Sequence, residues 1–285
     1  MRRFGPAFLF LLPMPLAAQL ALPHTFAVAS DVSMRIWVPA GTVRVETWDR
    51  DSIRVTGSLG RNSHFFGGSG GHGAKLGVEN NDSTDIGMPH GDLVVTVPRK
   101  AHVWIKMTDG EVIAMHTAGE LDVITVTGTI IAQDAEGVVS VETIDAAVTL
   151  AGINGEVRAR SGGGRLSLAQ LHGTLTAATV SGAIDLTGTA MADARLETIG
   201  GPIVVRGTVA HDALLDLETH NGPITLFLDR AALPALALSS RAGVVKNPLG
   251  PGNVKAGRIE ARSFKGDINV VAASGIEGKK ATTPP

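Results

Sequence analysis

Eight hydroxyl side chains recur along the second half of the chain, and a Ser or Thr hydroxyl is a candidate nucleophile for covalent catalysis. They are Thr125, Thr143, Ser161, Thr179, Thr198, Thr219, Ser240 and Ser263. A nucleophile needs an adjacent base, and eight repeated hydroxyls cannot each have one. We therefore interpret this column as structural, a row of hydroxyls that satisfies backbone groups beside a turn.

The spacing of the hydroxyl column predicts the fold. The sequence positions of the first four members differ by 18, and the later differences are 19, 21, 21 and 23. A Gly or Ala follows three positions after each hydroxyl: Gly128, Ala146, Gly164, Gly182, Gly201, Gly222, Gly243 and Gly266. Self-similarity with a period near twenty is typical of one structural unit stacked on itself.

Alternating apolar residues surround each hydroxyl and predict strands. Leu175-x-Ala177-x-Thr179 shows the alternation before the turn, and Ile184-x-Leu186 shows it afterwards. This period of two is typical of strands, and no window sustains the longer period of a helix. We predict an all-β fold, a single-stranded β-solenoid (β-helix) with coils of about 18–23 residues that stack about 4.8 Å apart.

The repeat also predicts the limits of the domain, which we place at residues 30–277. Upstream, Met107 takes the place of the hydroxyl, and residues 43–57 are predicted as one more coil. Between these coils, a glycine-rich segment near residues 59–91 is predicted as a flexible insertion. Residues 278–285 are predicted as a disordered tail.

Residues 1–29 are typical of an export signal. Arg2 and Arg3 precede an apolar stretch that is followed by small residues, and cleavage after Ala18 or after Ala29 fits the pattern. Prolines interrupt the stretch, and it is shorter than the ~20 apolar residues of a membrane span. We expect a mature chain without a transmembrane helix, located in the periplasm or at the cell surface.

Composition excludes several classes of function. The formal net charge is −2, with 25 basic and 27 acidic residues, so the basic surface of a nucleic-acid-binding protein is not expected. Cysteine is absent, which excludes disulfides and thiolate metal sites. Tyrosine is also absent and Trp occurs three times, which leaves little capacity for stacking on sugars or bases.

Outward positions on the predicted strands carry charges that are candidates for catalysis of polysaccharide cleavage, which uses paired carboxylates. Glu142 with Arg160, and Arg195 with Glu197 and Asp216, are expected to be neighbours on successive coils. Their alternating signs fit cross-strand charge pairing on a solvated sheet better than an active site. We assign no catalytic residue.

Metal sites are weighed in the same way. The stretch Asn80–Asp85 offers oxygen ligands but lacks the spacing and closing Glu of an EF-hand, and it is also typical of a turn. Five histidines fall in the first half of the chain: His64, His72, His90, His102 and His116. None has a tight metal-ligand spacing. We assign no metal and no cofactor.

The opening Gly41-Thr-Val-Arg-Val-Glu-Thr-Trp48-Asp-Arg-Asp-Ser-Ile-Arg-Val-Thr-Gly57, followed by the glycine-spaced ladder, resembles a bacterial putative-adhesin family of unknown function with β-strand repeats, related to the head GIN domain group. The resemblance covers roughly residues 28–271. It implies an exported or envelope-located protein and brings no catalytic residues with it.

These observations predict an exported, non-catalytic β-solenoid that works as an adhesin-like or scaffold module of the envelope, with an unknown protein or glycan as its partner. Two alternatives stay open. One is a β-helix enzyme that acts on polysaccharide, and the other is an envelope-stress sensor that acts through a protein partner.

Overall fold

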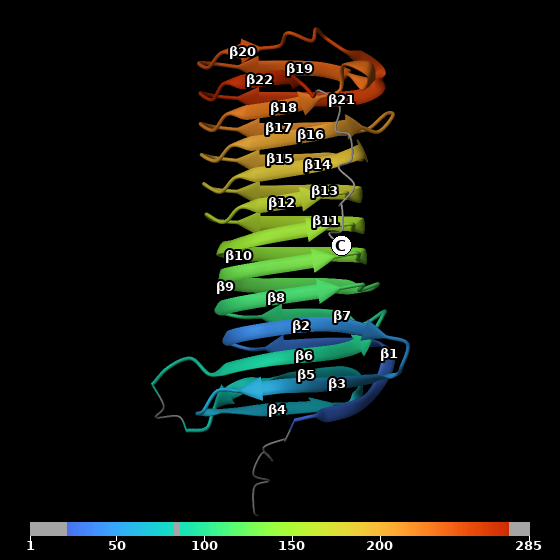
Figure 1. The fold of residues 1–285 in the computed structure, drawn as a ribbon, viewed down its shortest axis with the longest axis vertical. Coiled ribbons are helices and arrows are strands. Elements are labelled where there is room, and N and C mark those ends of the chain that lie inside the picture. The colour runs from blue at the N-terminus through green and yellow to red at the C-terminus, as the bar shows by residue number, and fades with distance from the viewer. Residues whose placement is uncertain (1–21, 83–85, 274–285) are drawn as a thin grey trace, which may run out of the picture.

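The computed structural model describes residues 22–82 and 86–273, and these residues form an all-β stack (Figure 1), as the alternation predicts. The only helical element among them is a short 3₁₀ turn, η1 (Arg230–Ala232). The strands are β1 (His24–Trp37), β2 (Ala40–Trp48), β3 (Ser52–Leu59), β4 (Ser63–Ser69), β5 (Gly71–Asn80), β6 (His90–Pro98), β7 (His102–Lys106), β8 (Asp109–Met115), β9 (Glu120–Gln133), β10 (Glu136–Ala151), β11 (Asn154–Ser161), β12 (Leu166–Ala169), β13 (His172–Thr179), β14 (Ile184–Met191), β15 (Ala194–Thr198), β16 (Ile203–Val209), β17 (Leu214–Thr219), β18 (Ile224–Leu228), β19 (Pro234–Ser240), β20 (Val245–Lys246), β21 (Asn253–Ser263) and β22 (Ile268–Ala272). The cleavage point after Ala18 and the tail at residues 278–285, both predicted from the sequence, lie outside the described residues.

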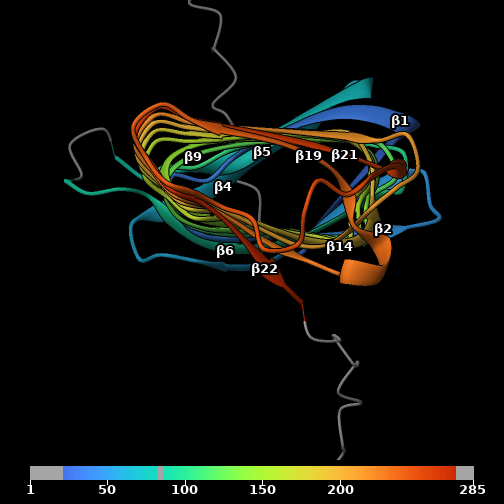
Figure 2. The same cartoon turned by 90° about the horizontal axis from the view of Figure 1, so that it is seen from above.

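The strands lie in two layers around a narrow interior, which Figure 2 shows end-on. We call one layer sheet I; it consists of β1, β7, β9, β10, β11, β13, β15, β17, β21 and β19. We call the other layer sheet II; it consists of β2, β8, β9, β10, β12, β14, β16, β18, β22 and β20. The long strands β9 and β10 contribute to both sheets because they run through the corner between them.

From β7 to β17 in sheet I and from β8 to β18 in sheet II, successive strands pair in parallel, one repeat apart. Val139 of β10 lies opposite Leu121 of β9, and Val157 of β11 lies opposite Val139, so each level advances the chain by one sequence repeat. Because the offset equals the repeat, equivalent side chains form straight columns. The inward columns are apolar and buried, and each fully buried Val, Leu or Ile side chain contributes about 1.5–3 kcal/mol to folding.

The N-terminal end of the stack contains antiparallel pairs. β3 pairs antiparallel with both β1 and β6, so the prediction of a regular coil at residues 43–57 is wrong for its second half. Alternation with a period of two is the same for parallel and antiparallel strands, and for this reason the sequence pattern did not reveal the reversal. Through β3, a ring of seven strands closes around the core, in the order β1, β3, β6, β2, β8, β9, β7.

The glycine-rich segment predicted as a flexible insertion instead contains two strands. β4 and β5 form an antiparallel hairpin, and β5 adds to sheet I by pairing in parallel with β1. Phe65, Leu76 and Val78 anchor the hairpin because their side chains are buried in the core. The glycine-rich segment Gly67–Gly73 still forms strands, and its glycines leave the outer face of the hairpin with few projecting side chains.

The C-terminal levels are not stacked in chain order. β21 pairs with β17 on one side and with β19 on the other, so the last coil of the chain lies inside the stack and the preceding coil ends it. β22 sits in the same way between β18 and β20. Burial explains the order: Ile259 and Ala261 of β21 are fully buried, whereas Leu236 and Leu238 of β19 are only half-buried at the open end.

Candidate functional site

The hydroxyl column lies at the corner where sheet I ends, and all of its hydroxyls except that of Ser161 bond to the backbone there. The N–H of Gly182 donates to Thr179 Oγ1 at 2.9 Å, and Gly201, Gly222 and Gly266 donate in the same way to the hydroxyl three positions before them. All members of the column except the half-buried Ser240 are buried. The column therefore holds the corner together and exposes little of its surface.

Glycine follows the column because consecutive levels approach closely at this corner. A Cβ atom at Gly222 would lie 1.8 Å from the carbonyl oxygen of Gly201 on the level below, and one at Gly201 would lie 1.8 Å from that of Gly182. No side chain fits at such distances unless the backbone moves.

A hollow of about 760 Å³ lies over the C-terminal half of the outer face of sheet I. Its lining includes Arg195, Glu197, Glu218, Arg262 and Phe264. We call it the C-terminal hollow. Of the charges that the sequence singles out, Arg195 and Glu197 line it.

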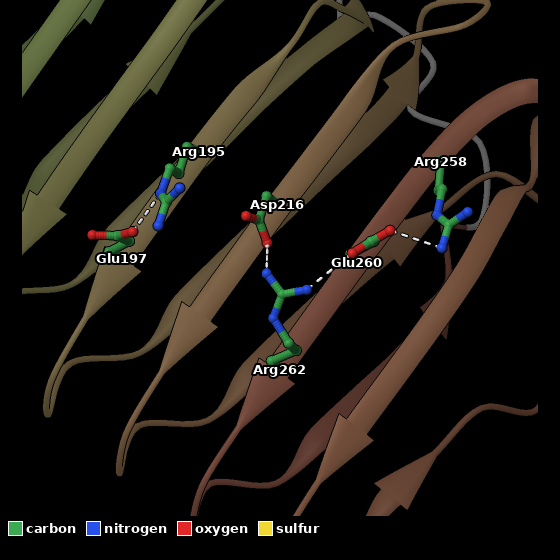
Figure 3. Close-up of polar contacts among 6 residues, drawn as sticks. All are labelled: Arg195, Glu197, Asp216, Arg258, Glu260 and Arg262. Carbon is green, nitrogen blue, oxygen red and sulfur yellow. Dashed lines mark hydrogen bonds and ion pairs between the residues drawn. The ribbon is translucent and has the colours of Figure 1, made fainter.

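Ion pairs occupy the charged groups in and beside the C-terminal hollow (Figure 3). The guanidinium of Arg195 donates to Glu197, which raises the pKa of Arg195 above its ordinary value. Arg262 donates to Asp216 at 2.5 Å and to Glu260 at 2.9 Å. Arg258 contacts the second oxygen of Glu260 at 2.7 Å. Glu197, Asp216 and Glu260 thus accept from arginines.

The predicted charge neighbours do lie side by side: Arg195 is directly opposite Asp216 in register, and it pairs with Glu197 on its own strand. The ion-pair partner of Asp216 is Arg262, on the strand at the other side of β17. Glu142 and Arg160 lie opposite each other in register, yet they form no ion pair among the residues that the structure describes.

A ridge of exposed side chains flanks the C-terminal hollow, directly after each hydroxyl of the column. We call it the corner ridge; its apolar members are Val126, Ile144, Val180, Ile199 and Phe264. On the same ridge, the ring of His220 stacks on Phe264 with 4.8 Å between centroids, and the Arg241 guanidinium lies 5.2 Å from the Phe264 ring. The polar and aromatic groups at this end of sheet I are therefore already engaged with one another.

A second hollow, about 490 Å³, lies over the N-terminal part of sheet I where β1, β7 and β9 run side by side. We call it the N-terminal hollow. Arg35, Trp104 and Asp122 form one row across the three strands, in register, and Ser33, His102 and Glu120 form the row beside it. All six side chains line the hollow.

The two rows of the N-terminal hollow differ in how far their charges are neutralised. His102 Nδ1 lies 3.1 Å from Glu120 Oε2, so this acid has a partner. In the other row, Arg35 forms no ion pair with any residue within the described ranges. Burial, reinforced by the neighbouring charge of Glu120, raises the pKa of Asp122 above its ordinary value of 3.8, against smaller opposing effects of Ser140, Arg158 and His102.

The N-terminal hollow continues across β1 onto the hairpin. An adjacent hollow of about 590 Å³ shares Ser33 and Arg35 with it and is floored by Gly68, Gly70 and Gly73 of the hairpin. A Cβ atom at any of these three glycines would meet nothing within 4 Å, so the floor is open to solvent. Trp37, half exposed, faces the same side of β1 as Arg35.

Histidines are distributed singly. His64, His72, His90 and His102 each lie within 3.4 Å of one carboxylate, that of Glu79, Asp31, Asp92 and Glu120 respectively. Within residues 22–82 and 86–273, no three His, Asp or Glu side chains gather in a way that would hold a metal ion. Part of the Asn80–Asp85 stretch lies outside the described residues.

Sequence reasoning missed the N-terminal hollow. It treated the three tryptophans as too few to matter, whereas the fold places Trp37 and Trp104, which are distant in the chain, on one outer face. The available signal was the period-two alternation around each, Met34-x-Ile36 and Val103-x-Ile105, which assigns both tryptophans to the outward side of their strands.

Comparisons with known proteins leave the family open. No protein-family model matches the chain, and no curated protein matches it. Among solved structures, a putative adhesin from Bacteroides fragilis is similar with a TM-score of 0.41 and 13% identity, covering 90% of this chain and 99% of that one. A putative cell adhesion protein from Clostridium sporogenes has a TM-score of 0.26 and 9% identity, covering 87% of this chain and 98% of that one. Such low scores carry no argument about this chain.

Across the part of the chain that the structure describes, no helix is both long and apolar enough to cross a membrane.

Proposed function

We propose that the chain is an exported, non-catalytic β-solenoid that serves as an adhesin-like binding module of the cell envelope. The observation that carries this proposal is the parallel register of one repeat per level, which sets outward side chains of sheet I in columns along the length of the stack. Such a surface suits the capture of an extended partner better than the enclosure of a small substrate.

The ion pairs of the C-terminal hollow support a non-catalytic role. Glycoside hydrolysis needs one carboxylic acid free to protonate the leaving group and a second carboxylate free to act on the sugar or on water. Glu197 and Asp216 instead accept from Arg195 and Arg262. The small exposed surface of the hydroxyl column also supports this role.

The start of β1 supports cleavage of the export signal after Ala18. Residues His24–Ala27 of β1 pair with β3, and Phe26 and Val28 are buried in the core. Cleavage after Ala29 would remove all of these residues and open the closed ring of strands. N-terminal sequencing of the exported protein should therefore read from Gln19, and a sequence that starts at Ser30 would contradict this choice.

Membership of the putative-adhesin family is part of the same proposal and rests on the Gly41–Gly57 motif and the glycine-spaced ladder. The test is capture of envelope components by the purified mature protein, with polysaccharide cleavage assayed in parallel by the release of reducing ends. The proposal expects a retained protein or glycan and no new reducing ends. Cleavage of any polysaccharide by the purified chain would overturn the non-catalytic role and favour a β-helix enzyme.

A further inference from the structure

We propose that the N-terminal hollow binds a neutral polysaccharide, with the indole of Trp104 as the platform for one sugar ring and with Arg35 and Asp122 as hydrogen-bonding groups on either side of it. This inference rests on the proposed binding function and names its ligand class. It is argued from the order of the side chains across β1, β7 and β9.

The row Arg35–Trp104–Asp122 has the geometry that a sugar ring requires. Neighbouring strands of a sheet lie about 4.8 Å apart, so a donor, an aromatic surface and an acceptor follow one another over roughly 10 Å. The C–H faces of a pyranose ring pack on an indole as other apolar groups do. Its equatorial hydroxyls then point sideways, towards the guanidinium and the carboxylate, which donate and accept hydrogen bonds respectively.

The sheet beneath the row holds these side chains in place. The residues that alternate with them, Met34, Val103, Ile105 and Val123, are buried in the core, which fixes the outward direction of Arg35, Trp104 and Asp122. Ser140 on the next strand bonds to the Asp122 carboxylate and orients it. The site is thus built on rigid strands, and little conformational entropy is lost on binding.

The neighbouring surface explains why a polymer is expected rather than a single sugar. Beyond Arg35, the glycine floor of the hairpin continues the hollow with open space above Gly68, Gly70 and Gly73. The row beside it supplies Ser33, His102 and Glu120 as further hydrogen-bonding groups on the same three strands. A chain of sugars that crosses the strands would meet the floor, Arg35, the indole and Asp122 in turn, with this second row alongside.

The charges of the N-terminal hollow favour a neutral polymer over an acidic one. Two carboxylates, Glu120 and Asp122, lie on the β9 side of Trp104, whereas the cations Arg35 and Lys75 lie opposite each other on β1 and β5. A uronate or sulfate group next to these acids would experience repulsion between like charges. Neutral hydroxyl groups, in contrast, are satisfied by acids and cations alike.

The test uses the mature full chain in native gels that contain hydroxyethylcellulose or galactomannan as neutral probes and polygalacturonate as an acidic probe. We expect a neutral polymer to retard the wild type and to quench its indole emission, which comes from only three tryptophans in a chain without tyrosine. Trp104→Ala should weaken this binding by on the order of tenfold or more. Arg35→Ala should weaken it by a smaller factor.

Two variants serve as controls. Thr176→Ala changes an exposed residue in the same outward column of sheet I, four levels beyond Trp104, and should bind as the wild type does. Trp48→Phe removes the indole that donates to the carbonyl of Ser52, outside the hollow, and should leave the quenching intact. Circular dichroism of Trp104→Ala should show the β-sheet spectrum of the wild type, because the side chain lies outside the core.

Three results would overturn the inference: no retardation by either neutral polymer, equal binding by Trp104→Ala, or stronger binding of polygalacturonate. If glycans fail while the wild type and Trp104→Ala retain the same envelope protein, the polysaccharide site is wrong and the proposed binding function stands. If the wild type retains no envelope component at all, both are wrong.

Discussion

The C-terminal and N-terminal hollows lie on the same outer face of sheet I but use their charged groups differently. In the C-terminal hollow, Arg262 joins Asp216 to Glu260, and the arginines and acids satisfy one another. In the N-terminal hollow, Arg35 and Asp122 are held apart by the width of Trp104. The same sheet therefore carries two kinds of surface. In the C-terminal hollow, charged side chains pair with one another, and in the N-terminal hollow, Arg35 and Asp122 are kept apart.

The two hollows differ because different side chains lie between their charged groups. On β17 and β21, Asp216 is directly opposite Glu260, with Arg262 close enough to bridge them. On β1, β7 and β9, the strand between Arg35 and Asp122 carries an aromatic residue instead. The volume of a hollow therefore does not identify the better candidate for binding. The C-terminal hollow is the larger of the two, at about 760 Å³ against about 490 Å³, but its charged groups pair with one another.

The largest expected effect is a difference in the free energy of unfolding between two glycine substitutions. One lies at the tightly packed corner beside the C-terminal hollow, and the other lies in the open glycine floor beside the N-terminal hollow. Gly222→Ala places a methyl group 1.8 Å from the Gly201 carbonyl oxygen, and we expect it to lower the free energy of unfolding by about 3 kcal/mol. Gly68→Ala puts the same group into open space and should change it by less than about 0.5 kcal/mol. Urea denaturation of both variants checks this, and equal effects would show that the two ends are packed alike.

A smaller effect is expected from the ion pair between Asp216 and Arg262. A double-mutant cycle with alanine at both positions should give a coupling of about 0.5–1 kcal/mol that shrinks at high salt concentration, because both groups are partly exposed. The matched cycle at Glu142 and Arg160, which are opposite in register without an ion pair within the described chain, should give less. Equal couplings in the two cycles would mean that the bridge seen in Figure 3 contributes nothing specific.

The smallest effect concerns Asp122, whose pKa is raised by burial and by Glu120. Its ionised form is less favourable in the folded chain than in the unfolded one, so its charge costs stability at pH values above the raised pKa. Asp122→Asn should therefore be slightly more stable than the wild type at neutral pH, and the gain should vanish as the pH falls to the ordinary value of 3.8. Asp216→Asn should be destabilised at neutral pH, because it removes the negative charge that pairs with Arg262. Denaturation curves across the acidic to neutral range distinguish the two signs.

The sequence repeat predicted the all-β class and the corner residues because both depend on local chemistry. The hydroxyl three positions before a glycine and the alternation on either side identify a place within one coil. They do not say which coil lies next to it, so the placement of β21 between β17 and β19 was not predictable. Burial of Ile259 and Ala261, a tertiary effect, decides that order.

The same limit applies at the N-terminal end and at the candidate site. The β4–β5 hairpin was missed because its glycine run has the composition of a flexible linker, while Phe65 and Leu76 hold it in the core. Trp104 could be assigned to an outward position from its neighbours alone. That Arg35 and Asp122 flank it depends on the pairing of β7 with β1 and with β9, which only the folded chain defines.

The most direct test of the contrast between the hollows is hydroxyl-radical footprinting with and without a neutral polysaccharide that the protein retains. Oxidation of Trp104 and Trp37 on the N-terminal part of sheet I should fall when the polymer is present, while that of Phe264 beside the C-terminal hollow should not change. Protection of Phe264 with unchanged oxidation of Trp104 would contradict the account and would place the binding surface at the other end of the sheet.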